Sequence, residues 1–419
     1  MSRNDAYDAY DAYDAYDAYD AYGHSRRAPN GLIAEGLTRS REGHLGQTVK
    51  TSTTSNKRLE LNTIRRWPDG PDNLPTKPLL LLPTIGAAVR GQLYQTNLLN
   101  DLYFVPTRDS VALKDRQFDG LMPVVFTLTR PSAKLFKDQA QRVESWATLR
   151  SERTPEILSQ LGPQIEYWSS IVNLNPAYSQ YTLELIGAAM AFASNIVQQI
   201  KYLLPVPRPS EYSPRIQPMI EPPPFFAYPS GHATQAFMIA KLQSLLLRDC
   251  DPPRIYPTPT ATLPSPPPPP TPPRIAPNIL KELEVQLYRQ AERIATNRVV
   301  AGVHYPIDSA AGCALGLILA EYFYHRCTGE AFCEGVFRVD ETPSTNSYFS
   351  DFEPDVKSDE VDVVTVEPVP GKSLHVSMSK PRPAGRIRLR TAADAALNPS
   401  PLAWLWFMAR REWNEPDYF

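Results

Sequence analysis

The chain has 419 residues, enough for two or three average domains or for one large domain with extensions. Its 43 Lys and Arg nearly balance its 45 Asp and Glu, which excludes the broad basic surface that nucleic acid binding needs. The 44 prolines are about twice the usual share of roughly 5% and indicate long loops and linkers.

The four cysteines, Cys250, Cys313, Cys327 and Cys333, form no CxxC pair and have no metal-binding spacing. We expect reduced thiols, with a Cys327–Cys333 bridge as the alternative in an oxidising compartment. The N-terminus has no basic region followed by an apolar one, and no stretch approaches about 18 charge-free apolar residues. These features predict a cytoplasmic protein without an integral membrane segment.

The first segment, residues 1–75, reads as a low-complexity leader and an extended arm. Residues 5–22 are six tandem copies of Asp-Ala-Tyr, a period that fits neither a helix face nor a strand. We expect disorder there, and a multivalent acidic and aromatic tether is the functional alternative.

Residues 76–330 have the patterns of a helical domain. A short apolar run at 79–82 and a loose apolar stretch at 118–128 come first. Apolar spacing then predicts helices over residues 137–150, 154–161, 165–172, 181–200, 230–247, 279–300 and 306–325. Small residues in the fourth and last of these favour close helix packing. The proline-rich segment 251–277 predicts an extended loop, or alternatively a ligand for a proline-binding domain.

The C-terminal extension, residues 331–419, has an acidic stretch at 351–367, a basic one at 380–390 and an aromatic end at 404–407. That end is a candidate for docking on the core. The fold class predicted for the chain is all-α: a helical bundle with a disordered leader and an irregular tail.

Three separated segments carry polar residues of chemical interest: 201–209, 227–235 and 297–308. Taken singly, a lysine or arginine after a helix is usually a solvated charge, Ser230 fits a helix N-cap, and His304 fits a structural histidine. Taken together they match the needs of a tetrahedral oxyanion. Lys201, Arg208 and Arg298 supply convergent positive charge.

The start of the helix at 230–247 adds backbone donors. Ser230, Gly231 and His232 offer unsatisfied N–H groups and the positive end of the helix dipole, and the glycine lets the backbone approach an anion closely. A neutral His304 could attack or coordinate the central atom. Asp308, four residues later, is the candidate that orients it, and His232 is the candidate acid or base.

The order Lys-x6-Arg-Pro, Pro-Ser-Gly-His and Arg-x5-His-x3-Asp, within residues 180–325, resembles the type 2 phosphatidic acid phosphatase and vanadium-dependent haloperoxidase superfamily. The resemblance implies an all-helical fold centred on a four-helix bundle. It also implies an oxyanion held by two arginines, a lysine, a serine and a glycine: Arg208, Arg298, Lys201, Ser230 and Gly231. Asn297 departs from the Ser or Gly that often precedes the arginine, at a position that we take as peripheral.

The resemblance leaves two chemistries open, because vanadate mimics the five-coordinate state of phosphoryl transfer. His304 would be the vanadium ligand of a peroxidase or the phosphorylated nucleophile of a phosphatase, with His232 as acid or base. Residues 227–235 and 301–305 look most like soluble haloperoxidases, and Phe225 takes the place of a residue that flanks their halide site. In that reading Lys201 would polarise the oxygen of bound peroxide.

We therefore expect a vanadate-dependent haloperoxidase that uses hydrogen peroxide and a halide. A soluble phosphomonoesterase that binds phosphate in the same site is the alternative. A third possibility is an oxyanion-binding scaffold without catalysis, although a pure binder has no need of an acid/base histidine. A homodimer formed through the helical core is plausible.

Overall fold

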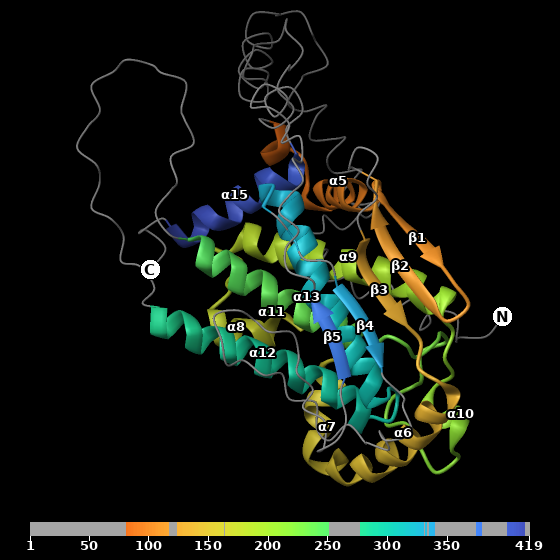
Figure 1. Ribbon diagram of the computed structural model, residues 1–419. Helices are drawn as coiled ribbons and strands as arrows, with labels where there is room; N and C mark the ends of the chain where they lie inside the picture. Colours follow the sequence, from red (N-terminus) through yellow and green to blue (C-terminus); the bar gives the residue numbers. More distant parts are fainter. Residues whose placement is uncertain are drawn as a thin grey trace, which may run out of the picture.

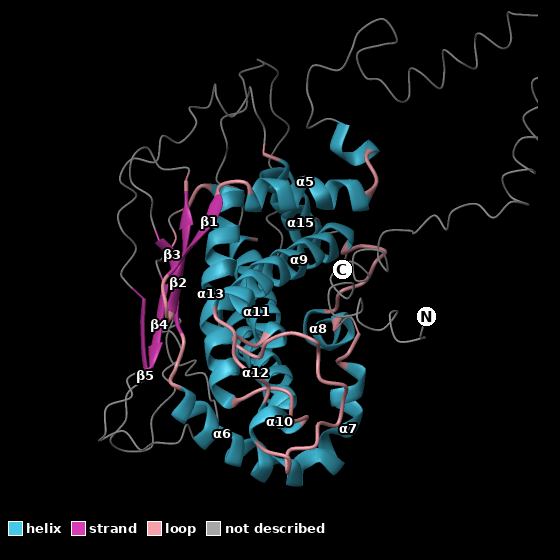
Figure 2. Cartoon of the chain, turned by 90° about the vertical axis from the view of Figure 1, so that its right-hand side faces the viewer, coloured by secondary structure: helices cyan, strands magenta, loops and turns pink. Residues whose placement is uncertain are grey.

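The computed structural model describes residues 81–116, 124–162, 164–250, 277–330, 332, 335–339, 374–378 and 400–414. The predictions for the leader, for most of the proline-rich loop and for a bridge to Cys333 lie outside these residues. The described part is mostly helical and carries one small sheet, which confirms the helical fold class and adds to it (Figures 1 and 2).

Four long helices form the core of the described chain. They are α9 (Gln180–Leu203), α11 (Gly231–Asp249), α12 (Pro277–Val300) and α13 (Pro306–Thr328). Helix α11 lies between the other three and packs on each of them (Figure 1). Each of these helices was predicted to within three residues at either end, because their apolar faces are long and Pro or Ser marks several of their starts.

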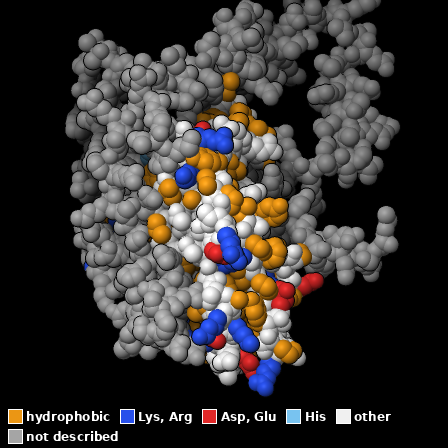
Figure 3. Space-filling view, turned by 45° about the vertical axis from the view of Figure 1, so that its right-hand side comes forward, with side chains coloured by type: hydrophobic (Ala, Val, Ile, Leu, Met, Phe, Trp, Pro, Cys, Tyr) orange, Lys and Arg blue, Asp and Glu red, His pale blue; other side chains and the backbone are white. Residues whose placement is uncertain are grey.

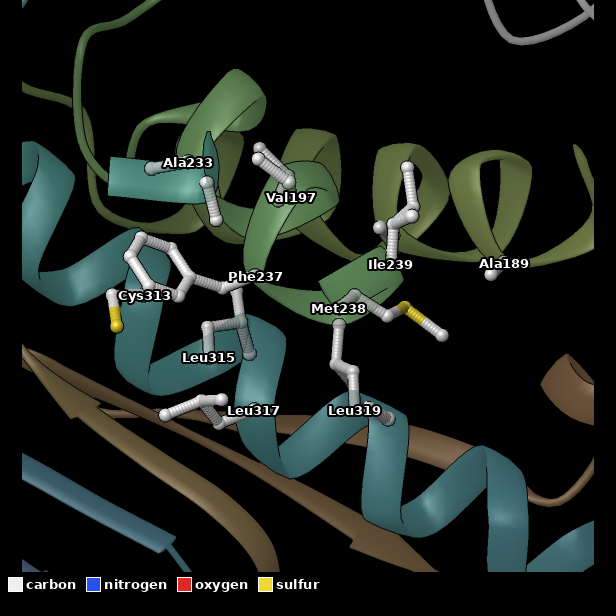
Figure 4. Packing of buried hydrophobic residues seen from close by; sticks show 14 of the residues in the cluster. Ala189, Val197, Ala233, Phe237, Met238, Ile239, Cys313, Leu315, Leu317 and Leu319 are labelled. Atoms are coloured by element: carbon white, nitrogen blue, oxygen red, sulfur yellow. The ribbon is translucent and has the colours of Figure 1, made fainter. Parts of the chain in front are cut away.

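Small residues allow α11 and α13 to approach each other closely. A Cβ on Gly312 would lie 2.6 Å from the carbonyl oxygen of Ser230, and one on Gly316 would lie 2.4 Å from that of Thr234. Figure 4 shows Phe237 of α11 in the apolar layer that this approach creates. The tight packing expected from the small residues of α13 is therefore confirmed.

Shorter helices cover the two ends of the core. Toward the lower end of Figure 1 lie α6 (Ala133–Trp146), η2 (Ala147–Leu149), α7 (Arg150–Ser159) and α10 (Pro209–Tyr212), while α8 (Ile165–Val172) packs on α12. Toward the upper end lie η1 (Leu82–Thr84), α5 (Ala87–Leu99) and α15 (Pro401–Asn414). Helix α15 buries Leu402, Leu405 and Trp406 against the core, so the aromatic end of the chain docks as expected.

A five-stranded sheet, which the sequence did not predict, lies along one side of α13 (Figure 2). Its strands, in spatial order, are β1 (Leu102–Pro106), β2 (Ser110–Asp115), β3 (Val124–Thr129), β4 (Gly335–Val339) and β5 (Leu374–Met378). Neighbouring strands are antiparallel except β3 and β4, which are parallel.

The sheet escaped prediction for two physical reasons. Each strand has only five or six residues, too few for a firm period of two. The parallel pair joins Phe126 to Gly335 across the whole helical core, and no local pattern encodes such a pairing. The apolar stretch at 118–128 ends inside β3, whose inward side chains pack toward α13.

Within the described residues two helices, α9 and α13, are long and apolar enough to cross a membrane, which our interpretation of the sequence did not expect. Each reaches a mean hydropathy of 1.2 over a window of 18 residues, although α9 contains Glu184 and Lys201 and α13 contains Asp308 and Glu321. In the structure 72% of that window in α9 and 89% of that in α13 is buried inside the protein. Core helices of a folded domain have the same composition, so their length alone does not place the protein in a membrane.

The surface shown in Figure 3 mixes charges of both signs with apolar side chains. Its described part has no continuous field of one sign, in keeping with the near balance of acidic and basic residues in the sequence.

Candidate oxyanion-binding site

The ends of the four core helices meet at one small cavity of about 90 Å³. Lys201 comes from the last turn of α9, His232 from the first turn of α11 and Arg298 from the last turn of α12. His304 lies in the loop that leads into α13, and Arg208 lies in the loop after α9. All five side chains line the cavity.

Lys201 and Arg208 are held by carbonyl oxygens of the loop before α11. The Lys201 ammonium donates to the oxygens of Phe226 and Ala227 at 2.6 and 2.9 Å, and Arg208 Nε donates to that of Phe225 at 2.9 Å. Both cations also lie over the Phe225 ring, 5.1 Å from its centroid. The ring therefore stabilises two neighbouring like charges through its negative face.

Arg298 is anchored by the end of α7. Its Nη2 atom donates to the carbonyl oxygen of Ile157 at 2.9 Å and to Oε1 of Gln160 at 3.2 Å. The same Gln160 oxygen accepts a hydrogen bond from Asn297 Nδ2 at 3.0 Å. Asn297 is fully buried and also bonds to Glu156, so the residue that we took as peripheral is part of the support of Arg298.

A tight turn links Arg298 to His304, and Gly302 makes it possible. Gly302 has φ +85°, and a Cβ there would lie 2.8 Å from Nη2 of Arg150 and 3.3 Å from Cα of Pro218. Arg150 Nε donates to the carbonyl oxygen of Val300 at 3.0 Å and holds the turn from outside. The six-residue spacing from the arginine to the histidine thus returns both side chains to one cavity.

Asp308 orients His304. Its Oδ2 atom lies 2.9 Å from His304 Nδ1 and accepts the Tyr305 backbone N–H at 3.0 Å. Arg208 Nη1 lies 3.2 Å from His304 Nε2. A proton on Nδ1 and a lone pair on Nε2 satisfy both contacts, so the nitrogen with the available lone pair is the one beside the arginine.

The first turn of α11 places backbone donors at the same cavity. Gly231 and His232 line it, and their N–H groups belong to the first helical turn, where no carbonyl of the helix can accept them. Ser230 lies behind them: its hydroxyl accepts from Ala233 N at 3.4 Å and its N–H donates to the carbonyl oxygen of Asp308 at 3.0 Å. Ser230 is thus the N-cap of α11, and Gly231 presents the helix end.

Burial and the positive charge of the nearby cations lower the pKa of both histidines. Burial, followed by the charge of Arg298, lowers the pKa of His232 to about 3. Burial, followed by the charges of Arg208 and Lys201, lowers the pKa of His304 well below its ordinary value. Burial also raises the pKa of Asp308 to about 7. Both imidazoles are therefore neutral at neutral pH, the state that a nucleophile, ligand or base requires.

The structure thus brings most of the predicted site residues to one cavity and places the others directly behind it. Lys201, Arg208, Phe225, Gly231, His232, Arg298 and His304 line the cavity. Ser230 and Asp308 support it and are fully buried. Sequence reasoning missed Gln160, because an ordinary glutamine at the end of a surface helix carries no signal of its own.

The donor set fits a tetrahedral oxyanion. Three fixed cations and a helix N-terminus favour a compact group with several negative oxygens, and His304 Nε2 offers one nitrogen to its central atom. Within the described residues no group of three His, Cys, Asp or Glu side chains could hold a metal cation. Vanadate or phosphate suits these residues, since both present negative oxygens and accept a nitrogen at the central atom.

A helical core whose helix ends gather cations and histidines around a cavity has the residues that an oxyanion-binding site would need. Residues 183–330 match the PAP2 superfamily, and these residues include α11, α12, α13 and nearly all of α9. This part of the chain is therefore a PAP2 superfamily domain, and that superfamily includes phosphatases and haloperoxidases. Comparison with curated proteins gives no match.

Proposed function

We propose that the protein is a vanadate-dependent haloperoxidase-like enzyme that oxidises halide with hydrogen peroxide, and that it acts in the cytoplasm. The observation that carries the proposal is a pair of neutral histidines, His232 and His304, that line one cavity together with three cations. Phosphoester hydrolysis needs a protonated acid for the leaving oxygen, whereas a neutral His232 is ready to accept a proton from peroxide.

The chain's own residues have distinct tasks in this reaction. His304, kept neutral and oriented by Asp308, would hold vanadium through Nε2. Lys201, Arg208 and Arg298 would balance the negative oxygens, and the Gly231 N–H would donate to one of them. When bound, vanadate supplies the centre at which peroxide is activated toward a halide.

The proton and halide steps depend on two further groups. His232 would take the proton of peroxide as a base, and Lys201 would polarise the oxygen that the halide attacks. Phe225 lines the cavity beside Lys201 of α9 and Arg208 of the following loop, so an anion there would be attracted by charge and would contact an apolar ring. A cavity of about 90 Å³ suits small reactants such as peroxide and a halide.

The test is bromination of a colorimetric acceptor by purified protein with orthovanadate, bromide and hydrogen peroxide. We expect vanadate-dependent bromination that excess phosphate suppresses, because the two anions compete for one set of donors. Folded protein that brominates at the rate of free vanadate would refute the proposal.

Phosphomonoester hydrolysis is the second candidate, favoured by the position of His304 Nε2 beside Arg208. In that reaction Nε2 would attack phosphorus, the arginines would stabilise the transition-state charge, and His232 would protonate the leaving oxygen. The bound anion would have to raise the pKa of His232 first. Turnover of para-nitrophenyl phosphate without vanadate, lost in His304→Ala, would establish this function in place of the peroxidase.

A further inference from the structure

Gln160 touches two residues of the proposed site although it lies outside its sequence motifs. It is the last residue of the α7 region, fully buried, and follows the helix as its C-cap. Its side-chain Oε1 accepts from Arg298 Nη2, and its backbone oxygen accepts from His232 Nε2 at 3.1 Å. One residue of α7 therefore joins the arginine of α12 to the histidine of α11.

The hydrogen bond to His232 selects one form of its imidazole. A backbone carbonyl only accepts, so the proton of neutral His232 lies on Nε2 and the lone pair on Nδ1. If Gln160 moved, the neutral ring could carry its proton on either nitrogen. The position of α7 thus decides which nitrogen of His232 can act as a base.

The amide of Gln160 differs from a carboxylate in one decisive respect. It anchors Arg298 through a hydrogen bond and adds no negative charge beside it. A glutamate would have the same shape and would pair with Arg298 at the expense of an incoming anion.

A network of ion pairs and amides fixes Gln160 itself. Asn297 Nδ2 donates to Gln160 Oε1 and to Glu156 Oε2, both at 3.0 Å. Arg153 Nη1 donates to Asn297 Oδ1 at 3.1 Å, and Arg293 forms two hydrogen bonds with Glu156 at 2.8 and 2.6 Å. Helices α7 and α12 are thereby locked together beside the cavity.

We propose that Gln160 is a positioning residue: it aligns Arg298 with His232 and leaves the positive charge of Arg298 available to the bound oxyanion. The proposal rests on the oxyanion site of the proposed function and applies to either anion. It gives Asn297, the departure from the superfamily pattern, the task of holding the glutamine in place.

The experiment compares Gln160→Glu and Gln160→Ala with the wild type. The dissociation constants of orthovanadate and of inorganic phosphate are measured separately by calorimetry, after thermal unfolding has shown that each variant is folded. We expect Gln160→Glu to weaken both anions by about tenfold to a thousandfold, since a charge partner commonly shifts a site by one to three powers of ten. Gln160→Ala, which adds no charge, should weaken them by less than about tenfold.

Gln235→Glu is the matched control. Gln235 lines the cavity, and its Nε2 donates to Ser194 Oγ at 2.7 Å. The new carboxylate is therefore added at the cavity but not at the Arg298 contact, and its effect should be clearly smaller than that of Gln160→Glu. Equal losses in the two variants would mean that charge in the cavity, and not the contact with Arg298, sets the affinity.

A second readout does not depend on anion binding. Nitrogen NMR of protein with ¹⁵N-labelled histidine should show the His232 proton on Nε2 in the wild type and also in Gln160→Ala, because alanine keeps the backbone carbonyl that accepts it. A purely structural role would lower the unfolding temperature and leave the anion affinity of Gln160→Glu unchanged. A wild-type proton on Nδ1, or unchanged anion affinity in Gln160→Glu, would overturn the proposal.

The outcome for Gln160 can be separated from that for the proposed function. If wild-type protein binds vanadate but oxidises no halide, the peroxidase reading fails while the affinities and the NMR signal still decide on Gln160. If the wild type binds neither anion, the oxyanion site itself is refuted and the inference falls with it.

Discussion

Buried charge is handled in opposite ways at the two ends of the helical core. At the upper end of Figure 1, Arg90 of α5 forms a two-pronged ion pair with Glu184 of α9, and Tyr94 donates to the same carboxylate. Burial alone would lower the pKa of Arg90, but the hydrogen bonds and charge of Glu184 raise it above its ordinary value. At the cavity end, burial and then the charges of Arg298, Arg208 and Lys201 lower the pKa of both histidines.

The contrast separates stability from function. The charge of a buried cation that is paired with a carboxylate is neutralised locally, so it attracts no ligand. Several cations held by carbonyl and amide oxygens keep a positive electrostatic potential at the cavity, which attracts an anion. The same core helix, α9, carries Glu184 near its first turn and Lys201 in its last. Substitutions at the Glu184 end should therefore change mainly the free energy of unfolding, and substitutions at the cavity end should change mainly activity and anion affinity.

The largest effect on function should come from His304→Ala. It removes the nitrogen that would bind vanadium or attack phosphorus, so turnover should fall at least about a thousandfold, to the background rate. Backbone bonds that fix the loop, such as that from Met219 N to Ala301 O, remain, and the variant should stay folded. Steady-state kinetics with a circular dichroism control measures both; retained turnover would remove His304 from the mechanism.

The largest effect on stability should come from the opposite end. Glu184→Gln leaves Arg90 buried without its counter-charge, and we expect the free energy of unfolding to fall by about 3–5 kcal/mol. Anion affinity at the cavity should be unchanged in the protein that remains folded. Urea unfolding and calorimetry measure the two quantities, and a combined Arg90→Leu, Glu184→Leu variant should recover part of the loss.

These two ends also differ in how far the sequence predicted them. The cations and histidines of the cavity lie in short motifs with fixed spacing, and a helix start and a glycine turn bring such spacing together. The long core helices followed from apolar periodicity. The sequence allowed Ser230 to be a helix N-cap or an oxyanion-binding residue, and in the structure its hydroxyl accepts the Ala233 N–H as the N-cap of α11.

Contacts between distant segments were beyond the sequence. Gln160 and Arg298 are 138 positions apart, and their hydrogen bond depends on how α7 packs on α12. The strands β3 and β4 are short, and all four core helices lie between them in the sequence. Neither amide contacts nor such strand pairs leave a periodic trace in one chain, so tertiary packing decides them.

A smaller expected effect is the pH dependence of stability, which tests whether the pKa of His232 is lowered in the folded protein. The folded-state pKa of His232 is about 3, below its unfolded value of about 6.5. Its contribution to stability is therefore complete above pH 6.5 and is lost as the pH falls toward 3. The loss is about 1.4 kcal/mol per pH unit for one proton.

His232→Gln should remove that slope. Asp308 has a raised pKa and acts in the opposite direction, but it is present in both proteins and cancels in the comparison. Urea unfolding at pH 7, 6 and 5 should show a shallower acid loss in the variant by up to about 1.4 kcal/mol per pH unit. Parallel curves would mean that burial and the nearby cations do not lower the pKa of His232.

The smallest expected effect concerns the N-terminus of α9. Glu412 of α15 accepts the N–H groups of Tyr181 and Thr182 at 2.6 and 2.8 Å and the Thr182 hydroxyl at 2.7 Å, so one carboxylate from the end of the chain caps the helix. Glu412→Gln keeps one acceptor oxygen and loses the charge that favours a helix N-terminus, and should cost about 1 kcal/mol in unfolding free energy.

Because α9 is a continuous helix from that cap to Lys201, the same variant asks whether its two ends are coupled. We expect the vanadate affinity at the cavity to stay within about twofold of the wild type, since rigid helix packing on α11 fixes Lys201 independently of the cap. Glu282→Gln, on an exposed position of α12, is the control for the loss of one surface carboxylate. If vanadate affinity fell together with stability in Glu412→Gln and not in Glu282→Gln, the contact with α15 would determine the position of Lys201. The two ends of α9 would then be structurally coupled.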